Sequence, residues 1–500
     1  MTTDSGENRR TSSQNVSEKT KVAETQPLYD PMDPSLPLNW SLKKKYFNLI
    51  VPAVLTFVVA FGSSIYTPAI VDVMVDFHVS QTAAILPLST YVLSLAFSGM
   101  ISAPISEIMG RLGTYRYLVP LSAIFTLACG FAPNFAALCI LRFFSGFFGS
   151  ATFAVSAGTG ADMFAPQDRA LPGSLQLFAP FLGPAMGPFI GGFVTQGNGW
   201  KWSQYALCII LAACYIPVWF LEETYLKVIL LRRQKAAEGY GAAAEPTDDK
   251  PKSKASTLLL GVVFITLLRP MKMLATEPIV IFLSLYVAYS FAVVFSFFGS
   301  IPYVFLVVYG FDRRDTGLVF LGLGLGCVLA IPTYVYLDKI TYMKEWHKKN
   351  DGIAVADHVN ISPEHRLWPA MIGGLGLPIG LFWYGWTANK DIHWIVPILG
   401  LVPFGWGNLC IYIATAIYLV DTYAALTAAS AIAANGLLRY MLGASFPLFT
   451  VQMYEHLGIG WATSVLGFLS LSMLPIPWAL FRWGATLRAR STLEKNAIME

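Results

Sequence analysis

Two arginines, Arg142 and Arg439, lie inside long apolar stretches of the sequence. A guanidinium in an apolar medium costs roughly 2.5 kcal/mol or more unless it is paired or reaches water, so residues of this kind usually serve a function. Arg142 lies near one end of its stretch, where its side chain could extend outward to water instead. Arg439 lies near the middle of its stretch and has no such exit. Both arginines are therefore candidate functional residues.

Acidic residues and histidines are missing from the middle of every apolar stretch, and Asp162, Glu277 and Asp421 fall at the edges. A proton carrier must titrate, which arginine does not do in proteins. Proton transfer by this chain would therefore use an edge carboxylate, or a tyrosine and water network tuned by Arg142. The sequence leaves both alternatives open.

Aromatic residues crowd the stretch 278–300, where Tyr286 and Tyr289 carry hydroxyl groups that need partners when buried. Aromatic walls bind planar or amphipathic molecules through stacking and cation–π contacts. We expect Tyr286, Tyr289, Asn435 and Arg439 to line a binding cavity. For most of the aromatic residues in this stretch, packing against neighbouring helices or the surrounding apolar phase is the preferred interpretation.

A glycine and proline motif with helical spacing lies between residues 183 and 192. Its glycines recur every four residues, so they share one helix face that permits close approach of another helix. Its prolines remove backbone hydrogen bonds and bend the helix. Gly322, Gly324 and Gly326 offer a similar surface, and we predict that the two glycine faces touch; ordinary small-residue packing is the alternative. The motif residues are Gly183, Pro184, Gly187, Pro188, Gly191 and Gly192.

A second motif, Glu107-Ile108-Met109-Gly110-Arg111, ends another apolar stretch with an acid, a turn glycine and a cation. Because helix N-termini attract carboxylates, we predict that Glu107 faces the start of the stretch 424–452. Its analogue Asp338 would face the start of the stretch 171–196, near Leu171. Glu107, Gly110, Arg111 and Asp338 would then form a gate that clamps two parts of the molecule together. A solvated carboxylate at the edge of an apolar stretch is the alternative.

The composition determines what kind of molecule holds these residues. The chain has 500 residues, of which 55% are hydrophobic and 13% are charged, and its mean hydropathy is +0.55. Soluble globular chains carry about 25% charged residues. The chain is therefore a membrane protein, which excludes a soluble enzyme, a nucleic-acid-binding domain and a secreted disulfide module. Its six cysteines lie in apolar runs without a CxxC pair, so we expect neither a metal site nor a cofactor.

Apolar stretches long enough to cross a bilayer as helices are about 20 residues long. The sequence predicts an all-α protein in which twelve such spans form two six-helix bundles. The predicted spans are 46–66, 83–105, 116–133, 136–162, 171–196, 202–222, 278–300, 315–338, 367–388, 394–418, 424–452 and 459–481.

The predicted organisation has equal halves, which is typical of an internally repeated transporter. We expect a disordered tail at 1–42, a bundle at 43–222, a flexible charged linker at 223–277, a second bundle at 278–482 and a tail at 483–500. With the N-terminus inside, cytoplasmic segments hold 28 of the 34 Lys and Arg residues and outer loops hold 4. This asymmetry predicts that both termini and the gate are cytoplasmic.

With these residues in view, the chain resembles a major facilitator superfamily transporter of the twelve-span drug:proton antiporter family, in its fungal multidrug and polyamine branch. Residues 183–192 resemble the family's antiporter motif, and the residues around Arg142 resemble its fourth-span motif. Glu107–Arg111 resembles the motif between spans 2 and 3, from which Ala103 and Leu112 depart. The resemblance implies a proton-coupling role for Arg142.

The resemblance further implies a proton-driven exporter of small organic compounds such as drugs, polyamines or fungal metabolites, working by alternating access. The alternative is a dedicated exporter of one endogenous metabolite, an organic acid or toxin, which is favoured if Arg439 faces the cavity as a counter-ion. A receptor and a membrane enzyme fit less well, since the tails are short and no catalytic constellation converges. We expect a monomer whose partners are substrate, protons and the lipid bilayer, without nucleic acid. The resemblance implies that the protein resides in the plasma membrane, although the charge asymmetry fits the vacuolar membrane equally well.

Overall fold

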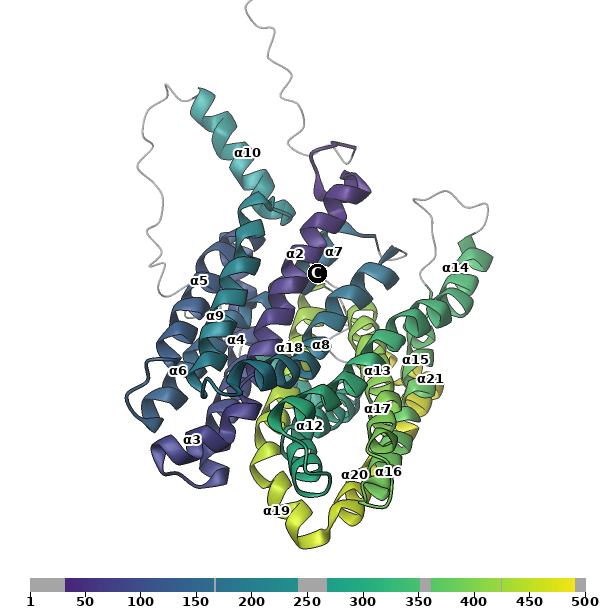
Figure 1. Ribbon diagram of the computed structural model, residues 1–500. Coiled ribbons are helices and arrows are strands. Elements are labelled where there is room, and N and C mark those ends of the chain that lie inside the picture. The colour runs from purple at the N-terminus through teal and green to yellow at the C-terminus, as the bar shows by residue number, and fades with distance from the viewer. Residues whose placement is uncertain (1–31, 166–167, 242–267, 351–360, 424, 491–500) are drawn as a thin grey trace, which may run out of the picture.

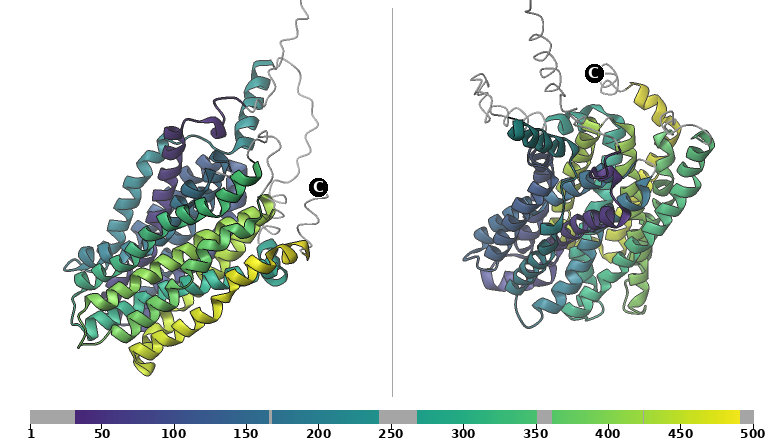
Figure 2. Two further views of the ribbon diagram at one scale, coloured as in Figure 1. Left: turned by 90° about the vertical axis from the view of Figure 1, so that its right-hand side faces the viewer. Right: turned by 90° about the horizontal axis from the view of Figure 1, so that it is seen from above.

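The computed structural model describes residues 32–165, 168–241, 268–350, 361–423 and 425–490. In these ranges the chain consists of helices and short connections, without a strand. The helices lie side by side in one elongated bundle (Figures 1 and 2). Most of both predicted tails, and residues 242–267 of the predicted linker, lie outside the described residues.

Helices that are apolar around much of their circumference form the first half, as expected where lipid offers the backbone no hydrogen bonds. They are α2 (Leu42–Ser64), α4 (Gln81–Met109), α5 (Arg111–Cys129), α6 (Phe135–Gly149) followed by α7 (Ala151–Met163), α8 (Ala170–Thr195), and α9 (Lys201–Tyr215) followed by η4 (Ile216–Phe220).

The second half repeats this arrangement. Its helices are α12 (Pro278–Val307), α13 (Arg313–Ile340), α15 (Trp368–Gly373) followed by α16 (Gly376–Thr387), α17 (Ile395–Thr422), α18 (Ala425–Ser445) followed by α19 (Pro447–Leu457), and α20 (Ile459–Met473) followed by α21 (Pro475–Arg490).

All twelve predicted spans coincide with these helical segments, and ten of the segments in the described ranges are long and apolar enough to cross a membrane. The other two positions, the third and the eleventh, are occupied by α5 and by α18 with α19, which contain more polar residues. Several helices extend beyond the predicted limits, because hydropathy detects only the part inside the hydrocarbon core. Two of the predicted spans break before Pro447 and Pro475, since proline cannot donate the next helical hydrogen bond.

Shorter helices lie at the two ends of the bundle. We call the end that carries α10 (Leu226–Gly241) and α14 (Tyr342–Asn350) the terminal face, and the end that carries α3 (Ile70–Phe77) and α19 the loop face (Figure 1). The predicted flexible linker is helical over most of its described residues, since α10 and residues 268–276 form helices, whereas residues 223–225 and 277 are not helical. The predicted C-terminal tail is helical as far as Arg490.

Two helix pairs dominate the packing inside the halves, α2 with α8 in the first and α13 with α17 in the second. Two further pairs, α8 with α13 and α4 with α18, join the halves. One hydrophobic cluster runs across this junction and includes residues of both halves. The junction between the halves is therefore a packed core in this conformation, and it positions the candidate site.

Candidate binding and coupling site

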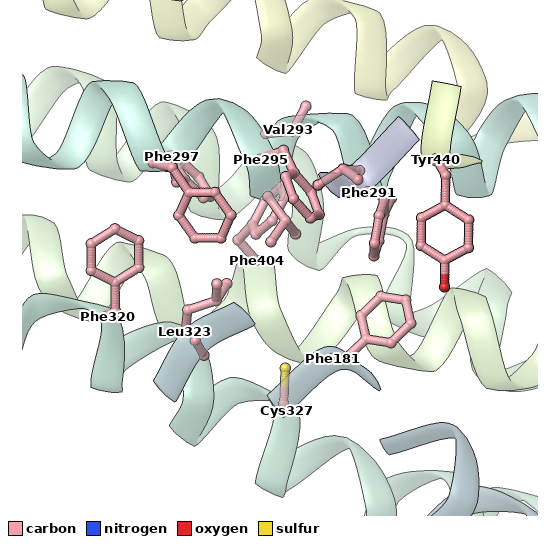
Figure 3. Close-up of a cluster of buried hydrophobic side chains, with 14 of the residues drawn as sticks. Phe181, Phe291, Val293, Phe295, Phe297, Phe320, Leu323, Cys327, Phe404 and Tyr440 are labelled. Atoms are coloured by element: carbon pink, nitrogen blue, oxygen red, sulfur yellow. The ribbon is translucent and has the colours of Figure 1, made fainter. Parts of the chain in front are cut away.

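Aromatic side chains from α8 of the first half and from α12, α17 and α18 of the second half meet at the junction; Figure 3 shows Phe181, Phe291 and Tyr440. The ring of Phe181, from the first half, lies 5.5 Å from that of Phe291 and 4.5 Å from that of Tyr412. Tyr440 packs edge-on against Phe291 at 5.5 Å, and Phe153 of the first half reaches Tyr440 at 6.0 Å. We call these five residues the aromatic box.

Arg439 lies in this box, with a side chain that is only 5% exposed. Its guanidinium carbon lies 4.5 Å from the ring centres of both Tyr412 and Tyr440 and 5.1 Å from that of Phe291. Its Nη2 donates to the Tyr440 hydroxyl at 3.0 Å. Its Nε and Nη1 have no hydrogen-bond acceptor within the described residues. The box therefore holds a buried cation that is only partly satisfied.

Asn435 lies one helical turn before Arg439 on α18 and is also buried. Its amide donates to the Ser284 hydroxyl of α12 at 3.4 Å. Since residues four apart share a helix face, Asn435 and Arg439 present polar groups to the same neighbour, α12. The structure thus brings together two of the four predicted cavity residues.

In this conformation the hydroxyls of Tyr286 and Tyr289 contact helices of the second half, and their predicted place in a binding cavity stays a prediction. The Tyr289 hydroxyl donates to the carbonyl of Leu466 on α20. The Tyr286 hydroxyl lies beside Gly374, between α15 and α16, and has no hydrogen-bond partner in the described residues. Both rings point into the second half because they lie on the opposite side of α12 from Phe291. The sequence indicated which residues need polar partners, but not which helix face meets the other half.

Arg142 is completely buried in the first half, where it joins α6 to α2, α4 and α9. Its Nη1 donates to the Gly62 carbonyl at 3.0 Å and to Gln204 Oε1 at 3.4 Å. Its guanidinium lies 5.3 Å from the Tyr66 ring and 4.6 Å from the Tyr91 ring. Extension of the side chain to water is therefore excluded here. Gly62 lies in the last turn of α2, so the cation stabilises a helix C-terminus.

The predicted gate residues Gly110 and Arg111 form a charge cluster at the terminal face, within the first half. Arg111 donates from Nε to Asp162 at 3.1 Å. The carboxylate of Glu223 accepts the backbone N–H of Arg111 at 2.9 Å and thereby caps α5. Gly110 has φ 86° and packs directly against Glu223, so this corner requires glycine. Sequence reasoning missed Glu223, which is 112 residues away from Arg111.

Glu107 is exposed at the terminal face. Its predicted partner, the start of the eleventh span, includes residue 424, which lies outside the described residues. The proposed clamp between Glu107 and this helix therefore stays a prediction.

Asp338 is buried, and its predicted place opposite the start of α8 near Leu171 stays a prediction. It forms a buried ion pair with Arg366, whose Nε also donates to Asp421 at 3.0 Å. Arg366 precedes the ninth span and Asp421 ends the tenth, just as Arg111 starts the third and Asp162 ends the fourth. The second half therefore repeats the charge cluster of the first, as an internal repeat predicts.

The predicted contact between the two glycine faces is wrong in its residues, although their helices do pack together. A Cβ added to Gly183 or Gly187 would meet the backbone of α2, at 2.6 Å from Phe61 N and 2.8 Å from Ile65 N. Gly322 and Gly326 face α17 in the same way. Of the six motif residues, Gly192 and Pro188 meet the α13 backbone, at Arg313 and at Gly317. Gly324 also faces α8 across the junction, near Ala185 and Leu182, whereas Gly183, Gly187, Gly191, Gly322 and Gly326 allow close packing inside their own half. Spacing alone could not assign these partners.

Three polar contacts join the halves at the loop face. Arg313 of the second half forms a bidentate ion pair with Asp72 of α3, at 2.7 and 2.9 Å. Gln196 donates to Asp312 at 3.1 Å. The side chains of Thr82 and Gln452 are hydrogen-bonded at 2.6 Å. We call these contacts the loop-face lock, because they hold this end of the two halves together.

Comparisons with known proteins agree with this geometry. The family model described as Major Facilitator Superfamily matches residues 53–447. The chain is 35% identical to Polyamine transporter 4 of Saccharomyces cerevisiae, over 94% of this chain and 74% of that protein. It is 39% identical to the MFS-type efflux pump MFS2 of Trichophyton rubrum, over 94% and 78%. The solved structure of the proton:xylose symporter XylE aligns with a TM-score of 0.63 at 16% identity, covering 88% of this chain and 97% of that one.

The family model and the relatives of 35 and 39% identity make this chain a membrane transporter rather than an enzyme. The lengths and hydropathy of the helices make it an integral membrane protein. The chain belongs to the major facilitator superfamily.

Proposed function

We propose that the chain is a proton-coupled exporter of small organic compounds that works by alternating access. The relatives named as an efflux pump and as a polyamine transporter support export of such compounds. The observation that carries the proposal is the asymmetry of the junction. The loop-face lock joins the two halves by an ion pair and hydrogen bonds at one end, whereas the ion pairs in the described part of the terminal face each lie within one half. Two rigid halves that are in contact at the loop face can rock, so that the loop face opens while the terminal face closes.

The proposed orientation places the terminal face in the cytoplasm and the loop face outside. The excess of Lys and Arg in the segments of the terminal face supports this orientation. The charge clusters around Arg111 and Arg366 then brace the cytoplasmic ends of the halves. We further propose residence in the plasma membrane and function as a monomer.

The proposed coupling residue is Arg142, in a role that it can fill without titrating. Its guanidinium lies on the rings of Tyr66 and Tyr91, whose hydroxyls donate to the carbonyls of Ala84 and Val59. A fixed positive charge favours the deprotonated form of a neighbouring acid or a nearby anion. Such a network would tie proton movement to the relative positions of α2 and α4.

The test is transport by the purified full-length chain in proteoliposomes with an imposed proton gradient. We expect substrate to accumulate against its own gradient when the compartment that receives it is acidic, and an uncoupler to abolish this accumulation. Counterflow, which needs no proton gradient, should persist under the uncoupler. Transport that is indifferent to the gradient would overturn proton coupling but would leave the transporter assignment intact.

A further inference from the structure

The buried guanidinium of Arg439 lacks a negative partner. Neither Nε nor Nη1 meets an acceptor in the described residues, and together these two atoms carry three N–H bonds. The side chain also forms no ion pair with any described acid. Cation–π contacts with Phe291, Tyr412 and Tyr440 offset part of the cost of burying this charge, but they leave those N–H bonds unused.

The box that surrounds this cation closes only when the halves meet. Phe291, Tyr412 and Tyr440 belong to the second half, whereas Phe181 and Phe153 cover them from the first half. Figure 3 shows Phe181, Phe291 and Tyr440 of this group. Separation of the halves would remove this cover and open the unpaired N–H bonds to a ligand. A binding group that is available in an open state and covered in a closed state is what alternating access requires.

We propose that Arg439 is the counter-ion for a substrate that carries an anionic group, such as a carboxylate, on a planar apolar or aromatic body. The inference rests on the proposed exporter function and names its substrate class. A carboxylate matches the guanidinium in charge and shape, and the surrounding rings match a flat apolar body. A polyamine, by contrast, would bring like charges together in an apolar site.

The amide of Asn435 and the hydroxyl of Ser284 lie one turn away from Arg439 on the face that meets α12. They offer a neutral donor and acceptor to a second polar group of the ligand. The site would thus be selective for one anionic group of the ligand and less selective for the type of its second polar group. The experiment therefore uses ligands that differ in charge and share one aromatic body.

We would measure binding of 1-naphthoate, 1-naphthamide and 1-naphthylmethylamine to the purified full-length chain by isothermal titration calorimetry. Binding in detergent needs no proton gradient, so this test is independent of the proposed coupling. We expect the carboxylate to bind roughly 10- to 100-fold more tightly than the amide, and the amine to bind most weakly. Equal or tighter binding of the amine, or no binding of the carboxylate, would overturn the proposal.

Substitution of Arg439 then tests whether this residue causes the preference for the carboxylate. R439Q should abolish the preference for the carboxylate while binding of the amide changes less than about threefold, and R439K should retain a weakened preference. R314Q removes an exposed cation at the loop face and should leave the preference unchanged. An unchanged preference in folded R439Q would overturn the assignment. If R439Q fails to fold, the ranking of the three ligands on the wild-type chain and on R439K decides.

Discussion

Arg142 and Arg439 are buried to nearly the same degree and both lie on tyrosine rings, yet their hydrogen bonding differs. Arg142 donates to the carbonyls of Gly62 and Pro87 and to Gln204, so it is built into the first half. Among the described residues, Arg439 has one tyrosine hydroxyl as its acceptor and two nitrogen atoms without one, whereas only Nη2 of Arg142 has none. The first arginine is therefore suited to hold helices in place, and the second to receive a ligand.

Replacement of Arg142 by lysine keeps the charge but loses the fork that reaches several acceptors. We expect R142K to fold, with a loss of about 1–3 kcal/mol of stability, and to lose at least tenfold in gradient-driven transport. Counterflow without a gradient should fall much less. R116K, a change of the same kind at a partly exposed position, serves as the control. Equal losses in both assays would mean that Arg142 only supports the fold.

Replacement of Arg366 by glutamine would leave two carboxylates, those of Asp338 and Asp421, close together without their cation. Because breaking a buried pair strands a buried charge, we expect R366Q to lose about 3–5 kcal/mol of stability. Thermal unfolding of the purified chain measures this loss. K44Q breaks a much more exposed ion pair with Glu222 and should cost less than about 1 kcal/mol. Similar losses in both variants would contradict the proposed importance of the buried cluster.

At the scale of helices, the spacing of apolar residues and prolines in the sequence predicted each segment and its neighbours along the chain. It could not predict which face of a helix meets which partner, because small residues serve packing inside a half and packing between halves equally well. Gly187 and Tyr289 show the limit: Gly187 was expected to contact the other half and Tyr289 to line a binding cavity, and in this conformation both contact helices of their own half. Charge pairs such as Arg111 with Glu223 depend on tertiary proximity, which leaves no local signal.

The glycine contacts predict opposite outcomes for two alanine substitutions. A Cβ at Gly187 would lie 2.8 Å from Ile65 N, so we expect G187A to lose about 1–3 kcal/mol of stability through displacement of α2. A Cβ at Gly324 would lie 3.6 Å from Ala185 and Leu182 across the junction of the halves, which is ordinary contact. G324A should therefore change stability by less than about 1 kcal/mol. Thermal unfolding distinguishes them, and equal stability would contradict these packing assignments.

For the whole molecule, composition and periodicity predicted a membrane protein with two repeated halves, because these properties are averages over many residues. The candidate site depends on which residues of the two halves come into contact, and a single sequence does not predict these contacts. Phe181, Tyr412 and Tyr440 come from three helices, and nothing in their local sequence indicates that they surround one arginine. The apolar position of Arg439 was the signal that did predict part of the site.

The loop-face lock predicts how the populations of conformations with an open and a closed loop face change when the lock is broken. R313Q removes a partly exposed ion pair worth up to about 1 kcal/mol, so we expect the ratio of open to closed loop face to rise by as much as fivefold. Spin labels on V75C and K390C, at exposed positions in different halves, report the distance between the two halves at the loop face by electron paramagnetic resonance. The charge exchange D72R with R313D should restore the closed population. K44Q, within the first half, should leave the distance distribution unchanged; a shift there would show that the effect is not local.

The bridge between Asp72 and Arg313 has one member on each half and is partly accessible to solvent. An antibody fragment that recognises both residues together would bind only while they are adjacent. Such a reagent would arrest turnover from the aqueous side, without entering the bilayer or competing with cargo. Inhibition of this kind would be non-competitive and insensitive to changes at Arg439.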